Sequence, residues 1–291
     1  MSQAIGPDSD GLGGIATFQR GGPATGAAYS ETVGSGELVL CPFPDHDVLC
    51  DPADDKIGAR LLSGRPYQRR HIDDALAILA AAGRLPPDGV FLDIGANIGT
   101  MTLYAMCSGR FSAALAIEPD PRNHSILRRN LALNNLSGRV VALSAAAGAA
   151  AGRVLLNIAA RNRGAHSVRP LGRAAPAGRT IDVAMTTADA AVQLSFARTP
   201  VTLAKIDVEG YELAVLDGMR GLLAVGVPLL IEVTSAVGES ADLRFAALRG
   251  RLGPCYRSVI DIQGAAAGGP SAPVPLAAFR ARVSQHDLLI Y

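Results

Sequence analysis

The stretch VFLDIGANIGT at residues 90–100 decides the fold. It starts as a short apolar run, which is typical of a strand buried on both faces, and it ends in a turn with two glycines. A helical pattern follows over residues 98–108, and a second apolar run covers residues 113–117. A strand, a glycine turn, a helix and another strand in this order predict a parallel α/β sheet.

Strand-like and helical segments keep alternating along the chain. Further helices are expected at residues 71–83, 121–134, 211–225 and 241–252. Further strands are expected at residues 139–147, 152–159, 203–207, 228–233, 256–262 and 286–291. Residues 161–179 read as a polar loop, and residues 181–192 fit neither pattern. The predicted fold class is α/β, with a mostly parallel sheet and helices on both of its faces.

The chain divides into three predicted parts. Residues 1–35 are rich in Gly, Ala, Ser and Thr without periodicity, so they are expected to form a flexible N-terminal tail. Residues 36–85 are expected to form a hairpin, broken by two prolines, and a helix. Residues 86–291 hold the alternating strands and helices and form the main domain.

The composition excludes several classes of protein. The chain has 27 Lys and Arg against 26 Asp and Glu, a formal net charge of +1, which argues against a nucleic-acid partner bound through a broad basic surface. Hydrophobic residues make up 49% of the chain, enough for a sizeable core, whereas aromatic residues make up 4% and Trp is absent. Stacking platforms for single-stranded bases are therefore scarce.

Targeting signals and cysteine clusters are also missing from the sequence. No apolar run approaches the ~20 residues that span a bilayer, and residues 1–10 lack the basic and apolar regions of a secretory signal. We therefore expect a cytoplasmic protein without a membrane partner. The four cysteines form no CxxC pair, so no zinc site is expected. Reduced thiols are the expected state, and a Cys41–Cys50 disulfide is the alternative.

The glycine turn after the first strand points to a cofactor. Open α/β sheets bind ligands at the carboxyl ends of their strands. Asp93 would repel a pyrophosphate at this position, whereas it suits the α-ammonium and sulfonium of S-adenosylmethionine (SAM). Gly95 and Gly99 allow close approach of the backbone, and Glu118 ends the next strand, where an acidic residue accepts hydrogen bonds from ribose hydroxyls. The alternative is a plain helix start that Asp93 or Asn97 caps.

Residues that end three neighbouring strands complete this expected site. Pro119 follows Glu118 directly, and Ser144 ends the third strand. The candidate cofactor-binding residues are Asp93, Gly95, Asn97, Gly99, Glu118, Pro119 and Ser144.

The general base is sought among four residues. Asp207 ends the strand at residues 203–207 and is the first candidate, and Glu209 is the second. Lys205 lies two residues before Asp207, on the same face of the strand, and can pair with it. The alternative is that both carboxylates cap the following helix. Glu232, in an apolar strand, and His166, in the polar loop, are the remaining catalytic candidates.

Two motifs resemble those of a known family. The turn Asp93-Ile94-Gly95-Ala96-Asn97-Ile98-Gly99, then Glu118-Pro119, and then residues 205–212 (KIDVEGYE) resemble the FkbM family of SAM-dependent methyltransferases. The resemblance is good over about residues 86–233. Residues 162–167 (NRGAHS) look like the loop of that family that carries a Gly and a Ser. Gln68 departs from the family, which has an acidic residue there.

This resemblance implies both a fold and a function. The implied fold is the Rossmann-like class I methyltransferase fold, a seven-stranded, mostly parallel sheet whose last strand is antiparallel. Residues 86–291 would then be the SAM-binding methyltransferase domain. The implied reaction is O-methylation of a hydroxyl on a sugar or a polyketide-type small molecule in natural product biosynthesis.

Several alternatives remain open at this point. The acceptor could be a macromolecule, a nucleic acid or a protein, although the acidic stretch at residues 207–210 lacks the stacking residues of base-modifying enzymes. A non-catalytic SAM-binding scaffold is a further alternative. No metal is required by the sequence, although the acidic residues leave the binding of a divalent ion open. A homo-oligomer is left open as well.

Overall fold

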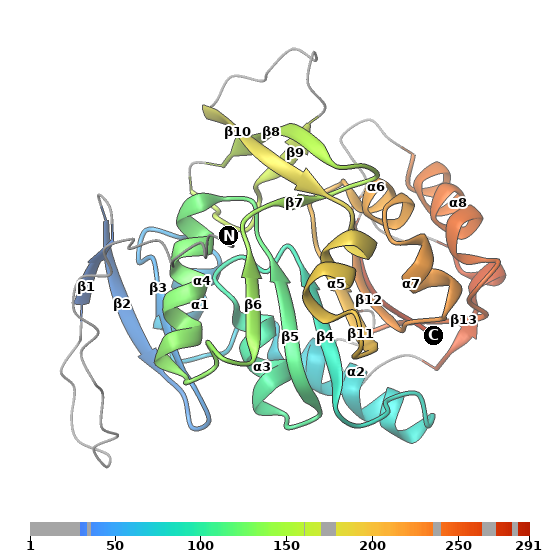
Figure 1. Ribbon diagram of the computed structural model, residues 1–291, viewed down its shortest axis with the longest axis horizontal. Coiled ribbons are helices and arrows are strands. Elements are labelled where there is room, and N and C mark those ends of the chain that lie inside the picture. The colour runs from blue at the N-terminus through green and yellow to red at the C-terminus, as the bar shows by residue number, and fades with distance from the viewer. Residues whose placement is uncertain are drawn as a thin grey trace, which may run out of the picture.

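The computed structural model describes residues 30–33, 36–159, 161–169, 179–234, 240–263, 272–280 and 285–291. Its centre is an eight-stranded sheet with the order β14-β13-β15-β12-β11-β4-β5-β6 (Figure 1). The strands are β4 (Gly89–Ile94), β5 (Phe111–Ile117), β6 (Val140–Leu143), β11 (Val201–Ile206), β12 (Leu229–Thr234), β13 (Ser258–Asp261), β14 (Val274–Pro275) and β15 (Gln285–Ile290).

The direction of the strands confirms the predicted fold class. Strands β6, β5, β4, β11 and β12 run parallel to one another. The last strand in the chain, β15, pairs antiparallel with β12 and with β13. The seven expected strands are therefore present, and the two-residue edge strand β14 extends the sheet by one.

Helices cover both faces of this sheet, as expected. Side chains alternate along β4, so that Phe91 packs into one core and Val90 and Leu92 pack into the other. The first core contains α2 (Arg69–Ala81), α3 (Thr100–Cys107) and α4 (Pro121–Leu133). The second contains α5 (Ala188–Phe196), α6 (Glu212–Asp217), α7 (Arg220–Ala224) and α8 (Ala241–Leu252).

Some element boundaries differ from the predictions at glycines. Helix α3 begins at Thr100 rather than Ile98 because Gly99 adopts a φ of 90°, outside the helical region. The expected helix over residues 211–225 is two helices, α6 and α7, with Gly218 between them. A Cβ at Gly218 would lie 1.9 Å from the carbonyl oxygen of Gly148. Only glycine therefore lets the chain between α6 and α7 approach the backbone of Gly148 so closely.

A second, four-stranded sheet lies over the carboxyl ends of the central strands (Figure 1). It consists of β7 (Ala146–Ala147), β8 (Gly152–Ile158), β9 (Ser167–Arg169) and β10 (Arg179–Thr186). The strand expected over residues 139–147 is therefore split between the two sheets. Residues 181–192, which fitted neither pattern, span the end of β10 and the start of α5. The expected loop over residues 161–179 contains β9, and residues 170–178 lie outside the described residues.

The N-terminal part forms a third sheet and two helices beside the central sheet. Strands β1 (Ser30–Val33), β2 (Gly36–Pro42) and β3 (Asp47–Cys50) pair antiparallel. Strand β1 falls within residues 1–35, so the expectation of a tail throughout that range is wrong for residues 30–33. Residues 1–29, 34 and 35 lie outside the described residues. Helix α1 (Ile57–Leu62) precedes α2.

Two further expectations concern a Cys41–Cys50 disulfide and membrane-spanning segments. The sulfur atoms of Cys41 and Cys50 lie 3.6 Å apart, beyond the ~2.05 Å of a disulfide bond. The two thiols are therefore neighbours rather than a cross-link. Among the residues that the structure describes, no helix is long and apolar enough to cross a membrane.

Buried asparagine amides fasten strand β3 to helix α4. Asn130 is fully buried; its Oδ1 accepts from the backbone N–H of Leu49 (2.7 Å), and its Nδ2 donates to the carbonyl oxygens of Leu49 (3.1 Å) and Ile98 (2.8 Å). Asn134, one turn later, makes the same pair of bonds to the backbone of Asp47 from a half-buried position.

We expect Asn130→Ala to lower the free energy of unfolding by about 3 kcal/mol, because it leaves three buried backbone groups without partners. Asn134→Ala is the matched control and is expected to cost about 1 kcal/mol, because water reaches its partners. Urea denaturation of both variants measures the difference. Equal losses would show that Asn130 does not fasten β3 to α4.

Candidate functional site

Two adjoining cavities open at the carboxyl ends of the central strands, with empty volumes of about 440 and 470 Å³. Glu118, Pro119 and His166 help line the first cavity. Lys56, Tyr67, Gln68, Lys205, Glu209 and Glu232 help line the second. Both cavities are lined by Gly95, Asn97, Gly164 and Asp207, which therefore stand at their junction.

The glycine turn fits tightly against the end of strand β11. Gly95 has a φ of 79°, and a Cβ there would lie 1.8 Å from the carbonyl oxygen of Asp207. A Cβ at Gly99 would lie 2.5 Å from Leu127 Cδ1. The N–H groups of Gly95 and Ala96 both donate to the carbonyl oxygen of Ile117, at 3.0 and 3.1 Å. The turn is thus fixed by backbone contacts on two sides.

Glu118 is held at the first cavity by backbone donors. Its Oε2 accepts from the N–H of Asn97, and its Oε1 accepts from the N–H of Asp120, both at 2.8 Å. The residue is 4% exposed, and burial raises the pKa of its carboxyl to about 7. Pro119 lines the same cavity. Each carboxylate oxygen keeps a lone pair that can accept a further hydrogen bond.

Ser144 does not take the place that the sequence predicted for it. It is exposed and lies outside the linings of both cavities, whereas Ala145 and Ala146 line the first. The chain leaves the central sheet at Leu143 to enter strand β7, which turns Ser144 away from the strand ends.

Asp93 lies beneath the site and does not line either cavity. It is fully buried; its Oδ2 accepts from Thr102 Oγ1 at 2.6 Å, and its Oδ1 lies 3.6 Å from Lys205 Nζ. Burial raises the pKa of its carboxyl, and the positive charge of Lys205 opposes that rise. Asp93 is thus enclosed beside the Lys205 ammonium, and its direct contact with a cofactor stays a prediction.

Lys205 links Asp93 to the junction of the cavities. Its Nζ lies 3.3 Å from Asp207 Oδ2 and donates to the carbonyl oxygen of Gly95 at 3.1 Å. The predicted Lys205–Asp207 pair is therefore present. Lys205 is 6% exposed, and the carboxylates of Asp207 and Asp93 raise the pKa of its ammonium although burial lowers it. The ammonium therefore stays charged beside Asp207.

Three carboxyl groups gather around the second cavity. Oxygen atoms of Asp207, Glu209 and Glu232 all lie within 4.8 Å of one another, a spacing that a metal ion could bridge. Burial, followed by the charge of Asp207, raises the pKa of Glu209 to about 7 and that of Glu232 to about 8. Groups that titrate near neutral pH can accept or release a proton there.

Amide side chains orient Glu232 from two other elements. Gln285, on β15, donates to its Oε1, and Gln68 donates to its Oε2 at 3.5 Å. Gln68 adopts a left-handed φ of 53° at the start of α2. The sequence did not single out Tyr67 or Lys56, which also line this cavity. They lie between recognisable elements, where no periodicity marks them.

His166 does not join these carboxyl groups. It lines the first cavity, and its Nε2 lies 3.7 Å from Asp120 Oδ2. Burial lowers the pKa of its imidazole. Of the other three catalytic candidates, only Asp207 shares a cavity with His166, whereas Glu209 and Glu232 line the second cavity.

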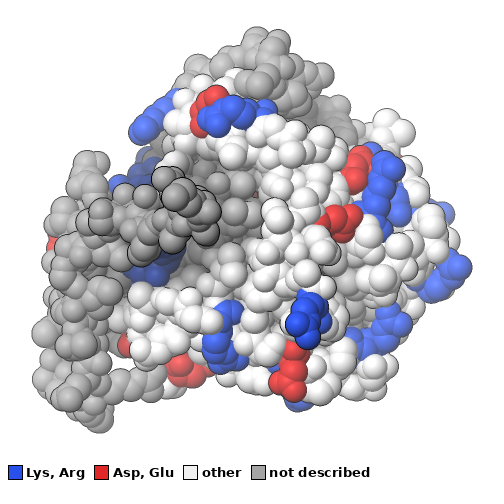
Figure 2. Space-filling view, in the orientation of Figure 1, with Lys and Arg blue, Asp and Glu red and all other residues white. Residues whose placement is uncertain are grey.

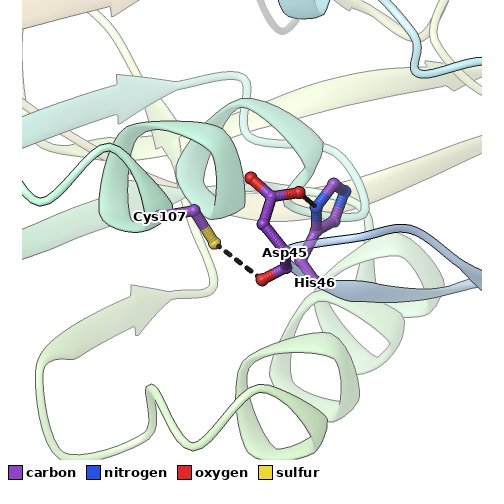
Figure 3. A group of neighbouring side chains, drawn as sticks. All are labelled: Asp45, His46 and Cys107. Atoms are coloured by element: carbon purple, nitrogen blue, oxygen red, sulfur yellow. Dashed lines mark hydrogen bonds and ion pairs between the residues drawn. The ribbon is translucent and has the colours of Figure 1, made fainter. Parts of the chain in front are cut away.

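A further group of three residues whose side chains could bind a metal ion lies where the N-terminal hairpin meets α3 (Figure 3). These residues are Asp45, His46 and Cys107. His46 Nδ1 lies 2.7 Å from Asp45 Oδ1, and Cys107 Sγ donates to the carbonyl oxygen of Asp45 at 3.5 Å. Arg69 lies 2.8 Å from Asp45 Oδ2, and its hydrogen bond lowers the pKa of that carboxyl to about 2. These contacts dock the hairpin onto the helices.

The surface seen in Figure 2 carries small groups of mixed charge. Some of the described Lys and Arg side chains there lie next to Asp or Glu, others stand alone, and neutral residues separate the groups. The described part of this face thus presents no continuous basic field. This agrees with the net charge of +1.

Residues 93–249 match the family model described as the methyltransferase FkbM domain. Two curated fungal proteins share short segments. "Methyltransferase 1" of Beauveria bassiana (strain ARSEF 2860) is 43% identical over 53 residues, which are 18% of this chain and 21% of that protein. "Methyltransferase sdnD" of Sordaria araneosa is 39% identical over 72 residues, or 25% and 28%. The chain thus matches only about a quarter of the length of these relatives.

Solved structures also match this chain, at low sequence identity. The methyltransferase FkbM from Methylobacillus flagellatus KT has a TM-score of 0.44 and 22% identity, and the match covers 70% of this chain and 44% of that chain. TYW2 of M. jannaschii, in complex with AdoMet, has a TM-score of 0.42 and 12% identity over 91% of both chains.

We expect Gly95→Ala to destabilise the protein by at least about 3 kcal/mol, because its Cβ would overlap the carbonyl oxygen of Asp207. Gly210→Ala is the matched control: its φ is 93°, but nothing lies within 4 Å of an added Cβ. The control should lose only the ~1–2 kcal/mol of a left-handed non-glycine residue. Urea denaturation separates the two. Similar losses would contradict the tight contact.

Glu232 should make stability depend on pH. Its carboxyl has an ordinary pKa of 4.5 and a folded pKa of about 8, so the folded protein holds this proton more tightly than the unfolded chain. The resulting stabilisation is complete below pH 4.5 and is lost as the pH rises through 8. Glu232→Gln should therefore gain at least about 1 kcal/mol relative to wild type between pH 5 and pH 9. Denaturation at both pH values tests this, with Glu37→Gln on an exposed residue as control.

Proposed function

The chain belongs to the FkbM methyltransferase domain family, whose model matches more than half of its 291 residues, and from that premise we propose an S-adenosylmethionine-dependent O-methyltransferase. The proposed acceptor is a hydroxyl of a sugar or a polyketide-type small molecule. The observation that carries this proposal is the position of Asp207 at the junction of the two cavities.

The first cavity fits the nucleoside part of the cofactor. Glu118 stands at the end of the second strand of the motif, and its carboxylate can accept hydrogen bonds from ribose hydroxyls. Pro119 and Ala145 add apolar lining. Gly95 lines both cavities, whereas Gly99 lies outside both linings and packs against Leu127.

The second cavity fits a polar acceptor. When bound, the cofactor supplies a methyl group on a sulfonium, which a hydroxyl oxygen can attack. The tasks of the protein are then to align that hydroxyl and to remove its proton. In this proposal Asp207, at the junction, accepts the proton, and the Lys205 ammonium lies 3.3 Å from its Oδ2. Glu209 and Glu232 line the acceptor side and can accept hydrogen bonds from other hydroxyls.

Calorimetric titration with SAM, S-adenosylhomocysteine and NAD tests the cofactor. We expect micromolar dissociation constants for the first two and no binding of NAD. Formation of S-adenosylhomocysteine with a panel of sugars and polyketides then tests the acceptor class. Binding of NAD alone would overturn the proposal, and SAM binding without turnover on any hydroxyl compound would favour the scaffold alternative.

We expect Asp207→Asn to keep the affinity for SAM within about threefold and to slow methyl transfer at least a hundredfold, because the amide cannot accept the proton. Glu209→Gln and Glu232→Gln are the comparison variants, since both change a carboxyl in the second cavity. Their rates should fall by less. Unaltered turnover in Asp207→Asn would assign the base to one of these glutamates.

A further inference from the structure

His166 has a buried nitrogen that the proposed reaction leaves unused. Its side chain is 6% exposed and lines the first cavity. Among the described residues, Nε2 has no hydrogen-bond partner. The nearby carboxylate oxygen, Asp120 Oδ2, lies 3.7 Å away, which is beyond hydrogen-bond distance. A buried polar atom without a partner is rare in folded proteins, so its ligand is to be sought in the cavity.

The other ring nitrogen fixes the tautomer. The backbone N–H of Ala159 donates to His166 Nδ1 at 3.0 Å, so Nδ1 carries a lone pair. The neutral ring then carries its hydrogen on Nε2. Burial favours this neutral form, and the charge of Arg163 adds to the effect, whereas Asp120 and Asp54 oppose it. His166 thus presents an N–H donor to the cavity.

The segment that carries His166 is anchored on two sides. The carbonyl oxygen of Arg163 accepts from Asn97 Nδ2 (3.0 Å) and from Asn123 Nδ2 (3.2 Å). The N–H of Asp55 donates to the carbonyl oxygen of Arg161 at 3.3 Å. The glycine turn, α4 and the N-terminal part therefore hold residues 161–166 over the cavity, and the position of the imidazole is set before any ligand binds.

We infer that His166 is a cofactor-binding residue whose Nε2–H donates a hydrogen bond to an acceptor atom of the nucleoside part of SAM. This inference rests on the proposed function. The ring shares its cavity with Glu118 and Pro119 and does not line the second cavity. Asp120, beside the ring, is bonded through its N–H to Glu118. The ring nitrogens of adenine and the ribose oxygens are the acceptors that belong at this end.

Two ligands and three variants test the inference by calorimetry. S-adenosylhomocysteine contains the whole skeleton, whereas methylthioadenosine keeps the nucleoside and lacks the amino acid. His166→Leu should weaken both at least tenfold, because the leucine cannot donate a hydrogen bond. His166→Gln keeps an N–H donor and should recover part of that loss. His124→Leu is the matched control, since His124 lies outside both cavity linings, and it should bind like wild type.

Each outcome leads to a definite conclusion. Unchanged affinity of His166→Leu for both ligands would overturn the inference. A loss for S-adenosylhomocysteine alone would place the ring at the amino-acid end and overturn the nucleoside assignment. Failure of the wild-type protein to bind either ligand would instead overturn the proposed function.

Nuclear magnetic resonance of the wild-type protein gives an independent measurement if the leucine variant does not fold. With ¹⁵N-labelled histidine, His166 should show a protonated Nε2, and saturation with S-adenosylhomocysteine should slow the exchange of that hydrogen with water. A protonated Nδ1, or an exchange rate that the ligand leaves unchanged, would overturn the inference.

Discussion

One buried ammonium group organises the carboxyl edge of the sheet. Lys205 Nζ lies between Asp93 and Asp207 and donates to the backbone of Gly95, so a single charge connects strands β4 and β11 to the glycine turn. An isolated charge of this kind would be costly to bury, and so would the carboxylate of Asp93. The ammonium of Lys205 and the carboxylate of Asp93 each offset part of the cost of burying the other. The position of Asp207 at the junction of the cavities depends on this arrangement.

Much of the fold follows from local patterns in the sequence. The apolar strands and the glycine turn predicted a mostly parallel sheet, and the resemblance to the FkbM family implied an antiparallel last strand. The strand pairing confirms both. The second sheet, β7 to β10, could not be predicted in this way. Its strands β7 and β9 are only two and three residues long, and they are held by pairing with β8 and β10 rather than by their own periodicity.

The candidate site was predictable to a similar degree. Glu118, Pro119, Gly95 and Asn97 do line the first cavity, because motif residues at strand ends must meet at one edge. The full burial of Asp93 could not be predicted, because spacing reveals which residues are near one another but not which of them reach the cavity. The contact between Gln68 and Glu232 could not be predicted, since it depends on how the N-terminal helices pack.

The two cavities draw their walls from different stretches of the chain. Every residue that lines the first cavity falls within residues 93–249, the segment that matches the family. The second cavity also takes Lys56, Ile57, Tyr67 and Gln68, which precede that segment. Substitutions in the N-terminal part can therefore reshape the second cavity while the lining of the first cavity stays the same. Under the proposed function, such a division would let the acceptor change through evolution while the donor site is kept.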